Sequence, residues 1–385
     1  IRKGGLASGS RLPSTRVLAE HLKVSRSTTQ MAYEQLMAEG YIETIPCKGC
    51  FVLNIEELTE VEPEVPRGFV VEPEQEETLV EVDFSPRGID LTHFPYNAWR
   101  KVTRNTLVDD NKEMFLTGSP QGEPGLREAI RRYLHSARGV NCTAEQIIVG
   151  AGNEYLFMLL SQILGRDKII AMENPTYKQA YLVFESLGHT MLPVTMDQYG
   201  MDVQILEKSG ADVAYSMPSH QYPMGIVMPI KRRQELLAWA ARGPNRYVIE
   251  DDYDSEFRYK GKPIPAMQGM DSLGNVIYMG TFSKSIAPAI RVGYLVLPKR
   301  LLHIYKKQYS FYASTVSRID QKIIYQFLVE GHYERHLNRM RAIYKSKHDL
   351  LLGELKGMEP YFDMEGEFAG LHILLRDKQG QKERW

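Results

Sequence analysis

Three features are scarce or missing in the sequence, and each excludes a class of protein. The 385 residues include only three cysteines, too few for a disulfide framework, which favours a reducing compartment. No run of eighteen apolar residues and no charged-then-apolar signal is present, so neither a membrane span nor a secretory leader is predicted. Net charge is −1 at pH 7, so only the distribution of charge can indicate a nucleic-acid partner. We expect a cytoplasmic protein.

Charge is unevenly distributed and divides the chain into three parts. Residues 1–53 carry seven Lys and Arg against four Glu, whereas residues 54–82 hold ten Glu and three Pro. The acidic stretch has too little apolar surface to order itself, and we predict a flexible linker there. The length of the chain and its hydrophobic content of 43% are typical of a globular protein of two or three domains. The predicted domains are therefore 1–53 and 83–385, joined by the linker.

Hydrophobic runs with the length of strands recur in residues 83–385. They lie at 146–150, 168–172, 211–215 and 246–250. Helical segments lie between them. This alternation predicts an α/β fold with a mostly parallel sheet that carries helices on both faces.

Residues 1–53 show the pattern of two short helices followed by a hairpin. Ser14 and Ser25 are suited to cap the two helices, and Gly40 is suited to end the second. Residues 41–44 and 51–53 are predicted as two strands, with Lys48 at the tip between them. The pattern predicts a winged helix-turn-helix. The residues expected to face inward are Leu18, Ala19, Leu22, Ala32, Leu36 and Met37.

The first turn of the second helix is rich in hydrogen-bonding side chains. Its residues are Ser25, Arg26, Ser27, Thr28 and Thr29. Hydroxyls and a guanidinium at an exposed helix N-terminus suit the phosphates and base edges of a DNA major groove. Such a run also occurs on solvated faces of other helical domains. The Cys47-Lys48-Gly49-Cys50 run has no second ligand pair nearby, so no metal site is predicted.

Four runs of this block together resemble the GntR-type winged-helix domain: Leu12–Ala19, Val24–Thr28, Leu36–Tyr41 and Gly49–Val52. The resemblance implies a partner, double-stranded DNA. It places Arg16 and Arg26 at the family's conserved arginines and Gly49 at its wing glycine, next to Lys48. In that family a first helix precedes the Leu-Pro-Ser entry, so we expect the chain to be truncated at its start.

Lys284 lies between two serines in the run Gly280–Ser285. A lysine amine is a useful nucleophile only when burial or nearby cations suppress its charge, and its commonest covalent use is a Schiff base with an aldehyde. Pyridoxal phosphate is the obvious aldehyde. It requires a carboxylate for its pyridinium nitrogen, a phenol near its ring oxygen, and hydroxyls and a cation for its phosphate.

The sequence offers a candidate for each of these requirements. Asp251 follows a predicted buried strand and is suited to the ring nitrogen, and Tyr253 lies on the same side of an extended chain. Tyr177 is a candidate to stack on the ring, and His220 lies at another strand end. The phosphate candidates are Gly152, Asn153 and Glu154 at a helix N-terminus, together with Thr281, Ser283 and Arg291. Each residue alone has an ordinary structural reading; their conjunction is the signal.

The spacing Asp-x-Tyr, Ser-Lys-Ser and Arg resembles the fold-type I pyridoxal-phosphate enzymes, from Phe84 to the end. Several runs, among them Pro218–Gln221, Glu250–Phe257 and Met279–Lys284, resemble the MocR/GabR-like subfamily, which fuses a GntR-type domain to an aminotransferase-like domain. This resemblance implies a homodimer, with the DNA-binding domain of one chain resting on the large domain of the other. It also implies that the arginine for an effector carboxylate lies beyond Trp385, in a missing C-terminal part.

Two hypotheses follow. In the first, the chain regulates transcription, and its aminotransferase-like domain senses an amine or amino acid through an internal aldimine at Lys284. In the second, it is a working aminotransferase with an accessory N-terminal domain. The winged helix favours the first, because an enzyme gains nothing from a DNA-binding domain on a tether. GABA, pyridoxal phosphate itself, taurine and D-alanyl compounds remain open as effectors.

Overall fold

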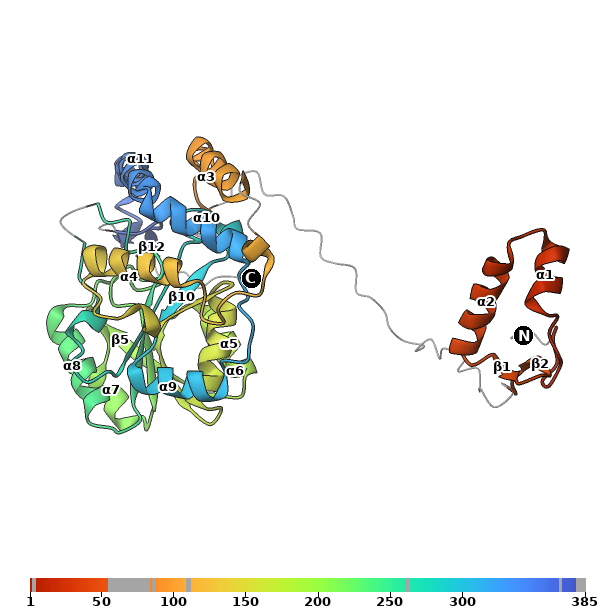
Figure 1. Cartoon of the computed structure of the whole chain (residues 1–385). Coiled ribbons are helices and arrows are strands. Elements are labelled where there is room, and N and C mark those ends of the chain that lie inside the picture. Colours follow the sequence, from red (N-terminus) through yellow and green to blue (C-terminus); the bar gives the residue numbers. More distant parts are fainter. Residues whose placement is uncertain are drawn as a thin grey trace. The chain divides into compact units, whose positions relative to one another are not determined.

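A computed structural model describes residues 1, 5–54, 84, 88–108, 112–259, 263–366 and 369–378. The chain divides into two compact units, residues 1–82 and 83–385 (Figure 1). Almost all of the predicted linker, from residue 55 onward, lies outside the described residues.

The small unit has the predicted order of two helices and a hairpin. It consists of α1 (Thr15–Leu22), α2 (Arg26–Ala38), β1 (Ile42–Ile45) and β2 (Gly49–Val52). The Ser14 hydroxyl accepts a hydrogen bond from the N–H of Val17, and the Ser25 hydroxyl accepts one from Thr28, so both serines cap helices as the sequence indicates. Gly40 follows α2 with φ of +78°, a conformation that glycine adopts without strain.

The core of the small unit contains Leu12, Ala19, Tyr33, Ile42 and Val52. The expected inward stripe is wrong at two positions, because Leu22 is 55% exposed and Ala32 is also exposed. Helix α2 instead turns Thr29 and Tyr33 inward, four residues apart and therefore on one face. The Tyr33 hydroxyl donates to the Pro13 carbonyl at 2.8 Å, so a polar atom is satisfied inside this core.

The hairpin forms the wing. Ile45 pairs with Gly49 at its end, which leaves a turn of Pro46, Cys47 and Lys48. The N-terminal segment adds an edge to this hairpin, since the Leu12 N–H donates to the Cys50 carbonyl at 2.8 Å and the Val52 N–H donates to the Ser10 carbonyl at 2.9 Å. Strand β2 therefore lies between β1 and the N-terminal segment.

The large unit is built on an eight-stranded sheet with the strand order β3-β10-β9-β8-β7-β4-β5-β6. Strands β9, β8, β7, β4 and β5 are parallel, which agrees with the sequence prediction, whereas β10 is antiparallel to both β3 and β9. Short β6 is antiparallel to β5. The strands are β3 (Ile147–Gly150), β4 (Ile169–Asn174), β5 (Thr190–Asp197), β6 (Gly200–Met201), β7 (Val213–Ser216), β8 (Tyr247–Asp252), β9 (Val276–Thr281) and β10 (Gly293–Val296).

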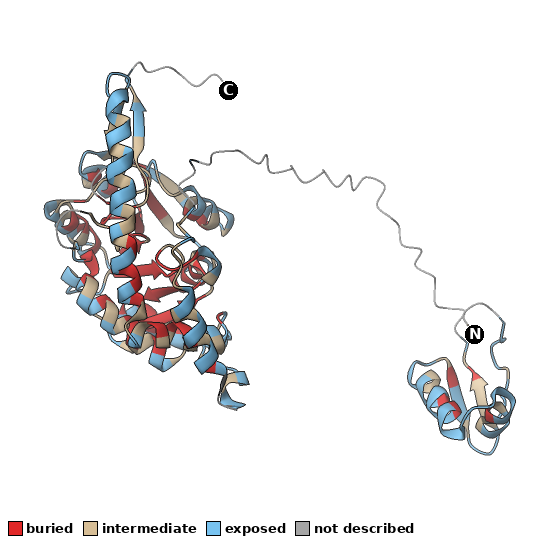
Figure 2. Cartoon of the chain, turned by 90° about the horizontal axis from the view of Figure 1, so that it is seen from above, coloured by how far each residue is buried: buried red, intermediate tan, exposed pale blue. Residues whose placement is uncertain are grey.

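Helices cover both faces of this sheet, and Figure 2 shows the buried residues gathered on the strands between them. One face packs against α5 (Asn153–Leu164), α6 (Lys178–Ser186) and α9 (Lys299–Gln308). The other packs against α4 (Pro124–Arg138), α7 (Val203–Lys208), α8 (Ile230–Ala241), α10 (Arg318–Val329) and α11 (His332–Leu355). Side chains alternate along each strand, so Ile249 and Asp251 share the α5 face of β8, and Val248, Glu250 and Asp252 share the opposite face.

The remaining elements lie at the margins of the large unit. Helix α3 (Tyr96–Val108) packs against α10, and β11 (Phe362–Glu365) pairs with β12 (Leu374–Asp377). The short 3-10 helices are Lys112–Phe115, Ala144–Gln146, Met267–Met270, Pro288–Ile290 and Lys356–Met358. Among the described residues no helix has the length and apolarity that crossing a membrane requires.

Candidate functional site

Asp251 is the buried carboxylate at the end of β8, where ligands bind in open α/β sheets. Its Oδ2 accepts a hydrogen bond from the hydroxyl of Tyr215 on the neighbouring strand β7. Its Oδ1 is buried and has no hydrogen-bond partner among the described residues. Burial, reinforced by Asp252 and Asp254, raises the pKa of Asp251 to about 7 against the opposing effect of Tyr215. A buried carboxylate with one unpartnered oxygen fits a cationic ring N–H.

Lys284 lies in the connection between β9 and β10 and is partly buried. Burial lowers the pKa of its amine, while the charge of Asp254 opposes this shift. The next residue is fixed from α11, since the Tyr333 hydroxyl donates to Ser285 Oγ at 2.9 Å and His336 Nε2 lies 3.0 Å from the Ser285 carbonyl oxygen. A lysine with a lowered pKa on an anchored loop is suited to covalent work on a carbonyl.

Strand pairing brings the phosphate candidates together. Gly293 of β10 is opposite both Thr281 of β9 and Gly150 of β3. The loop that begins at Phe282 and the N-terminus of α5 therefore lie next to each other at the same end of strands β9, β10 and β3. Because a helix N-terminus presents free N–H groups, this edge suits an anion.

Gly152, which caps α5, is in close contact with Arg291. A Cβ added at Gly152 would lie 2.6 Å from Arg291 Nη2, and φ of Gly152 is +87°, so a side chain is excluded there. Arg291 also pairs with Glu154 at 2.6 Å, and the buried Oδ1 of Asn153 has no partner among the described residues. The Ser283 N–H donates to Thr281 Oγ1 at 3.1 Å. Glu154 thus holds the guanidinium of Arg291, the cation that the sequence analysis predicts to bind the phosphate.

Tyr253 and His220 lie next to each other on the adjoining strand ends. The Tyr253 hydroxyl lies 3.0 Å from His220 Nδ1, and the same nitrogen lies 2.9 Å from Asp254 Oδ2. Tyr177 is partly buried, and burial followed by the charges of Asp251 and Glu154 raises its pKa to about 12. Tyr177 therefore stays a neutral ring near the carboxylate of Asp251.

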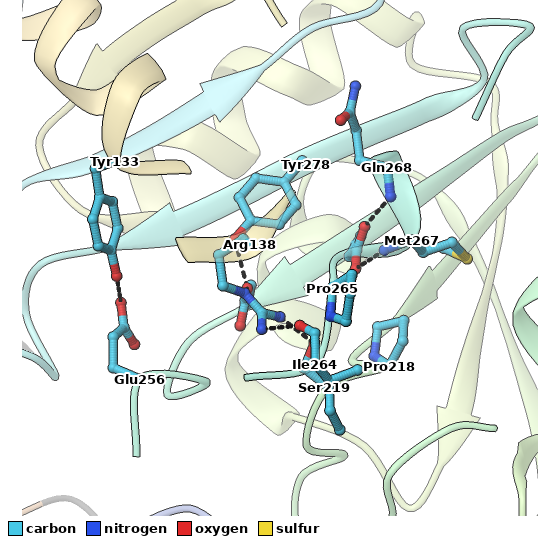
Figure 3. Close-up of polar contacts among 12 residues, drawn as sticks. Tyr133, Arg138, Pro218, Ser219, Glu256, Ile264, Pro265, Met267, Gln268 and Tyr278 are labelled. Atoms are coloured by element: carbon cyan, nitrogen blue, oxygen red, sulfur yellow. Dashed lines mark hydrogen bonds and ion pairs between the residues drawn. The ribbon is translucent and has the colours of Figure 1, made fainter. Parts of the chain in front are cut away.

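The opposite face of β8 is held by a buried ion pair (Figure 3). Arg138 Nε lies 2.8 Å from Asp252 Oδ2, and the Tyr278 hydroxyl donates to the same oxygen at 2.5 Å. Arg138 also donates to Ser219 Oγ and to the Ile264 carbonyl. Breaking a buried pair of this kind is strongly destabilising. The network fixes the strand that carries Asp251 without entering the site.

Several residues of the site escape sequence reasoning. Tyr215, Asp254 and His372 belong to it, although none stands in a spacing pattern that assigns it a role. Asp254 directly follows Tyr253 of the Asp-x-Tyr spacing, and a carboxylate so close to that spacing could have indicated that it belongs to the site. His372 comes from a distant segment, and its ring centroid lies 5.1 Å from that of His220.

The small unit presents the predicted DNA-contacting residues on its surface, with one exception. Arg16, Ser25, Arg26, Ser27, Thr28 and Lys48 are exposed, and Gly49 is partly exposed. Thr29 is only 3% exposed, and its hydroxyl donates to the Thr15 carbonyl at 2.8 Å and to the Arg26 carbonyl at 3.0 Å. Thr29 is therefore a packing residue, because it lies on the inner face of α2. Sequence reasoning also missed exposed Arg11, whose Nε would lie 3.1 Å from a Cβ added at wing residue Gly49.

Comparison with known protein families gives two matches. The model of aminotransferase class I and II matches residues 89–376, and the model of bacterial regulatory proteins of the gntR family matches residues 1–52. The first match lies within the large unit and the second within the small unit.

Three curated proteins align with nearly the whole of this chain. The chain is 38% identical to YdeL of Bacillus subtilis, described as an uncharacterized HTH-type transcriptional regulator, over 97% of this chain and 81% of that protein. It is 32% identical to PdxR, the HTH-type pyridoxine biosynthesis transcriptional regulator of Corynebacterium glutamicum, over 98% and 81%. It is 30% identical to MocR, the probable rhizopine catabolism regulatory protein of Rhizobium meliloti, over 98% and 79%.

Solved structures similar to the large unit are aminotransferases. An archaeal alanine:glyoxylate aminotransferase is 25% identical, with a TM-score of 0.68 over 76% of this chain and 74% of that one. The multiple substrate aminotransferase of Thermococcus profundus is 26% identical, with a TM-score of 0.66 over 75% and 74%. The eight-stranded sheet is thus that of a fold-type I aminotransferase.

Proposed function

The chain belongs to the MocR/GabR-like GntR regulators, which join a winged helix to a class I and II aminotransferase domain, and we propose that it senses an amine or amino acid and reports it to DNA. A DNA-binding transcriptional regulator is what this membership supports most directly. The finer proposal concerns how the large unit detects its effector. In this proposal Lys284 forms the bond that an effector amine can replace, and the small unit responds through its binding to DNA.

The aminotransferase family implies pyridoxal phosphate as the cofactor. When bound, it would supply an aldehyde carbonyl that the Lys284 amine could hold covalently and for which an effector amine could compete. Asp251 is proposed to bind the ring nitrogen and Tyr177 to stack on the ring. Tyr253, held next to His220, is proposed to face the ring oxygen. Gly152, Asn153, Thr281, Ser283 and Arg291 are proposed to hold the phosphate, with Glu154 orienting the arginine.

The observation that carries the proposal is the unpartnered Oδ1 of Asp251. A buried carboxylate oxygen without a donor is costly, and β8 is held by the Arg138–Asp252 network rather than by this oxygen. Such a group is retained where a ligand completes it. In the same unit Lys284 has a lowered pKa. The two residues supply the two contacts that distinguish pyridoxal phosphate from other phosphates.

Further parts of the proposal rest on the family alone. We propose a homodimer in which the small unit of one chain rests on the large unit of the other, and a cytoplasmic protein bound to a promoter operator. Exchange of Lys284 for an effector amine changes charge at the site. It shifts the arrangement of the units only if the effector has different affinities for the two states.

The sensing proposal is tested by spectral titration. Purified full-length protein with pyridoxal phosphate is expected to show the visible band of a protonated Schiff base, and Lys284→Ala is expected to lack it. A panel of amines and amino acids is then added with and without promoter DNA. An identical spectrum for Lys284→Ala overturns the proposal. Sustained transamination at ordinary enzyme rates without specific DNA binding favours an aminotransferase instead.

The DNA-binding proposal is tested by substitution in the first turn of α2. Arg26→Ala is expected to weaken operator binding by about 1–3 kcal/mol, measured by fluorescence anisotropy at fixed salt. Arg100→Ala is the matched control, because exposed Arg100 on α3 has the same charge in the other unit. Equal operator affinity for both variants contradicts the assignment of α2.

A further inference from the structure

The hydroxyl of Tyr253 belongs to a buried group of three polar side chains. Its oxygen lies 3.0 Å from His220 Nδ1. The same nitrogen lies 2.9 Å from Oδ2 of Asp254 and 3.1 Å from its Oδ1. The side chains of His220 and Asp254 are only 1% and 2% exposed. A single ring nitrogen therefore joins a carboxylate to a phenol inside the large unit.

Asp254 decides which proton His220 carries. An ionised carboxylate only accepts hydrogen bonds, so its contact with Nδ1 requires a hydrogen on that nitrogen. Burial alone would lower the pKa of His220, but the charge of Asp254 raises it above its ordinary value. A nitrogen that carries hydrogen cannot accept a hydrogen bond from Tyr253. The imidazole therefore holds the phenol oxygen without taking its proton.

Tyr253 keeps this proton at all ordinary pH values. Burial, followed by the charges of Asp254 and Asp251, raises the pKa of its hydroxyl well above the ordinary value for tyrosine. A phenol that receives a hydrogen bond at its oxygen is also a stronger donor, because hydrogen bonds in a chain polarise one another. Tyr253 is therefore suited to donate to an acceptor in the site.

The backbone at Gly370 fixes the position of the imidazole. A Cβ added at Gly370 would lie 1.9 Å from His220 Cε1 and 2.8 Å from Asp254 Oδ2, and φ of Gly370 is +80°. The Gly370 N–H donates to the Phe257 carbonyl at 2.7 Å, and the Tyr259 hydroxyl donates to the Gly370 carbonyl at 2.7 Å. Only glycine allows this close approach. The ring of His220 is thereby confined between the Gly370 backbone and Asp254.

His372 is the other titratable ring next to His220, with the ring centroids 5.1 Å apart. Its Nε2 lies 3.0 Å from the Pro223 carbonyl oxygen. Burial lowers the pKa of His372, and the charge of His220 lowers it further. His372 is therefore a neutral ring that donates to a backbone carbonyl, and Asp254 is the acid that pairs with His220.

We propose that His220 is the positioning residue of Tyr253: its Nδ1–H holds the phenol oxygen, and Asp254 keeps that hydrogen on Nδ1. The inference rests on the proposed function, because Tyr253 is the residue proposed to face the ring oxygen of the cofactor. It leaves the Tyr253 proton free for that oxygen. The role predicted for His220 from the sequence thus changes, since His220 acts on the cofactor only through Tyr253.

The test follows the pH at which the Schiff base at Lys284 loses its proton. The full chain is loaded with pyridoxal phosphate, and the visible band is recorded across pH to give its midpoint. A hydrogen bond donated to the ring oxygen weakens the attraction of that oxygen for the imine proton, so loss of the donor raises the midpoint. Tyr253→Phe removes the hydroxyl and is expected to raise the midpoint by about 1 unit.

His220 and Asp254 are tested by three single variants. His220→Ala is expected to raise the midpoint, because the phenol loses the group that holds it. Asp254→Asn is expected to raise it as well, because Nδ1 can then lose its hydrogen and accept the Tyr253 proton. His220→Asn places an amide donor near the position of Nδ1 and is expected to restore the wild-type midpoint. If His220→Ala does not fold, as judged by circular dichroism, Asp254→Asn decides the proposal.

A double variant distinguishes action through Tyr253 from direct contact with the cofactor. If His220 acts through Tyr253, Tyr253→Phe combined with His220→Ala has the midpoint of Tyr253→Phe alone. Additive shifts mean that His220 contacts the cofactor itself, and they overturn the inference. Unchanged midpoints for His220→Ala and Asp254→Asn also overturn it.

His189→Asn is the matched control. His189 is a histidine of the same unit that is 5% exposed, and its Nε2 lies 2.6 Å from Ser161 Oγ. The control is expected to keep the wild-type midpoint, and a shift equal to that of His220→Ala overturns the inference. Absence of the visible band from the wild type overturns the proposed function, and the inference with it. A normal band whose midpoint no variant moves overturns the inference alone.

Discussion

Burial sets the protonation of several single residues in the large unit. Glu173, Glu250 and Asp251 are each at most 3% exposed, and burial raises the pKa of each to about 7. The folded chain therefore binds protons that the unfolded chain has released between pH values of about 4 and 7. Because the folded state binds more protons at these three carboxyls in that window, their contribution to stability falls as pH rises through it.

Glu173→Gln isolates this effect at one residue. Glu173 Oε1 accepts a hydrogen bond from the Ser216 hydroxyl at 2.9 Å, and its Oε2 has no partner among the described residues. The glutamine cannot ionise, so the variant is expected to gain stability relative to the wild type between about pH 5 and about pH 8, by up to about 3 kcal/mol. Urea unfolding at the two pH values measures the gain. A difference between the proteins that is independent of pH contradicts the assignment.

Residues whose role follows from their local position in the chain were predicted from the sequence. Residues whose role depends on the pairing register between strands were not. Asp251 was predicted because it follows a buried strand. Its donor Tyr215 lies on β7, and only the pairing of Tyr215 with Ile249 and of Ser216 with Glu250 brings the two side chains together. The Asp254–His220 contact joins two strand ends 34 positions apart. No spacing rule covers such a distance.

At the scale of elements, helix α2 shows how one polar side chain changes a predicted face. Thr29 was expected on the exposed turn, but its hydroxyl is satisfied by two carbonyl oxygens and so can be buried. That contact turns Tyr33 inward and Ala32 outward. The cap positions and the hairpin were predictable, because they depend on local residues alone.

Thr29→Val tests the packing role. Valine has the same shape, but it leaves the Thr15 carbonyl without its side-chain donor, so unfolding of the small unit is expected to be easier by about 1 kcal/mol. Operator affinity below the transition is expected to stay unchanged. Thermal unfolding and anisotropy measure the two quantities. A large loss of affinity without a loss of stability would return Thr29 to the DNA-contacting set.

Strand β10 is not among the strands predicted from the sequence, and its direction departs from the parallel strands. Alternating strands and helices predicted the parallel strands, whereas β10 follows β9 after a loop rather than a long helix and runs antiparallel. Its insertion between β3 and β9 is what brings Gly152 to Arg291. Local sequence patterns can identify a strand, but they do not specify which strands pair with it or in which direction.

At the scale of the whole molecule, each unit has its own hydrophobic core. The small unit buries Leu12, Tyr33, Ile42 and Val52, whereas the large unit has three clusters on the two faces of its sheet. We expect two unfolding transitions in calorimetry, with the small unit melting first because small cores stabilise less. Pyridoxal phosphate is expected to raise only the transition of the large unit, since a ligand stabilises the state that binds it. One transition that moves as a whole contradicts independent units.

The pairing of β3 with β10 also has a consequence for synthesis. Gly150 and Gly293 are neighbours in the sheet although 143 positions separate them, and long loops close slowly. The winged helix has its own core among residues 1 and 5–54, so it can fold while the ribosome is still translating. A nascent chain therefore acquires its DNA-binding surface first. The contact between Gly152 and Arg291 can form only after Val296, the end of β10, has emerged.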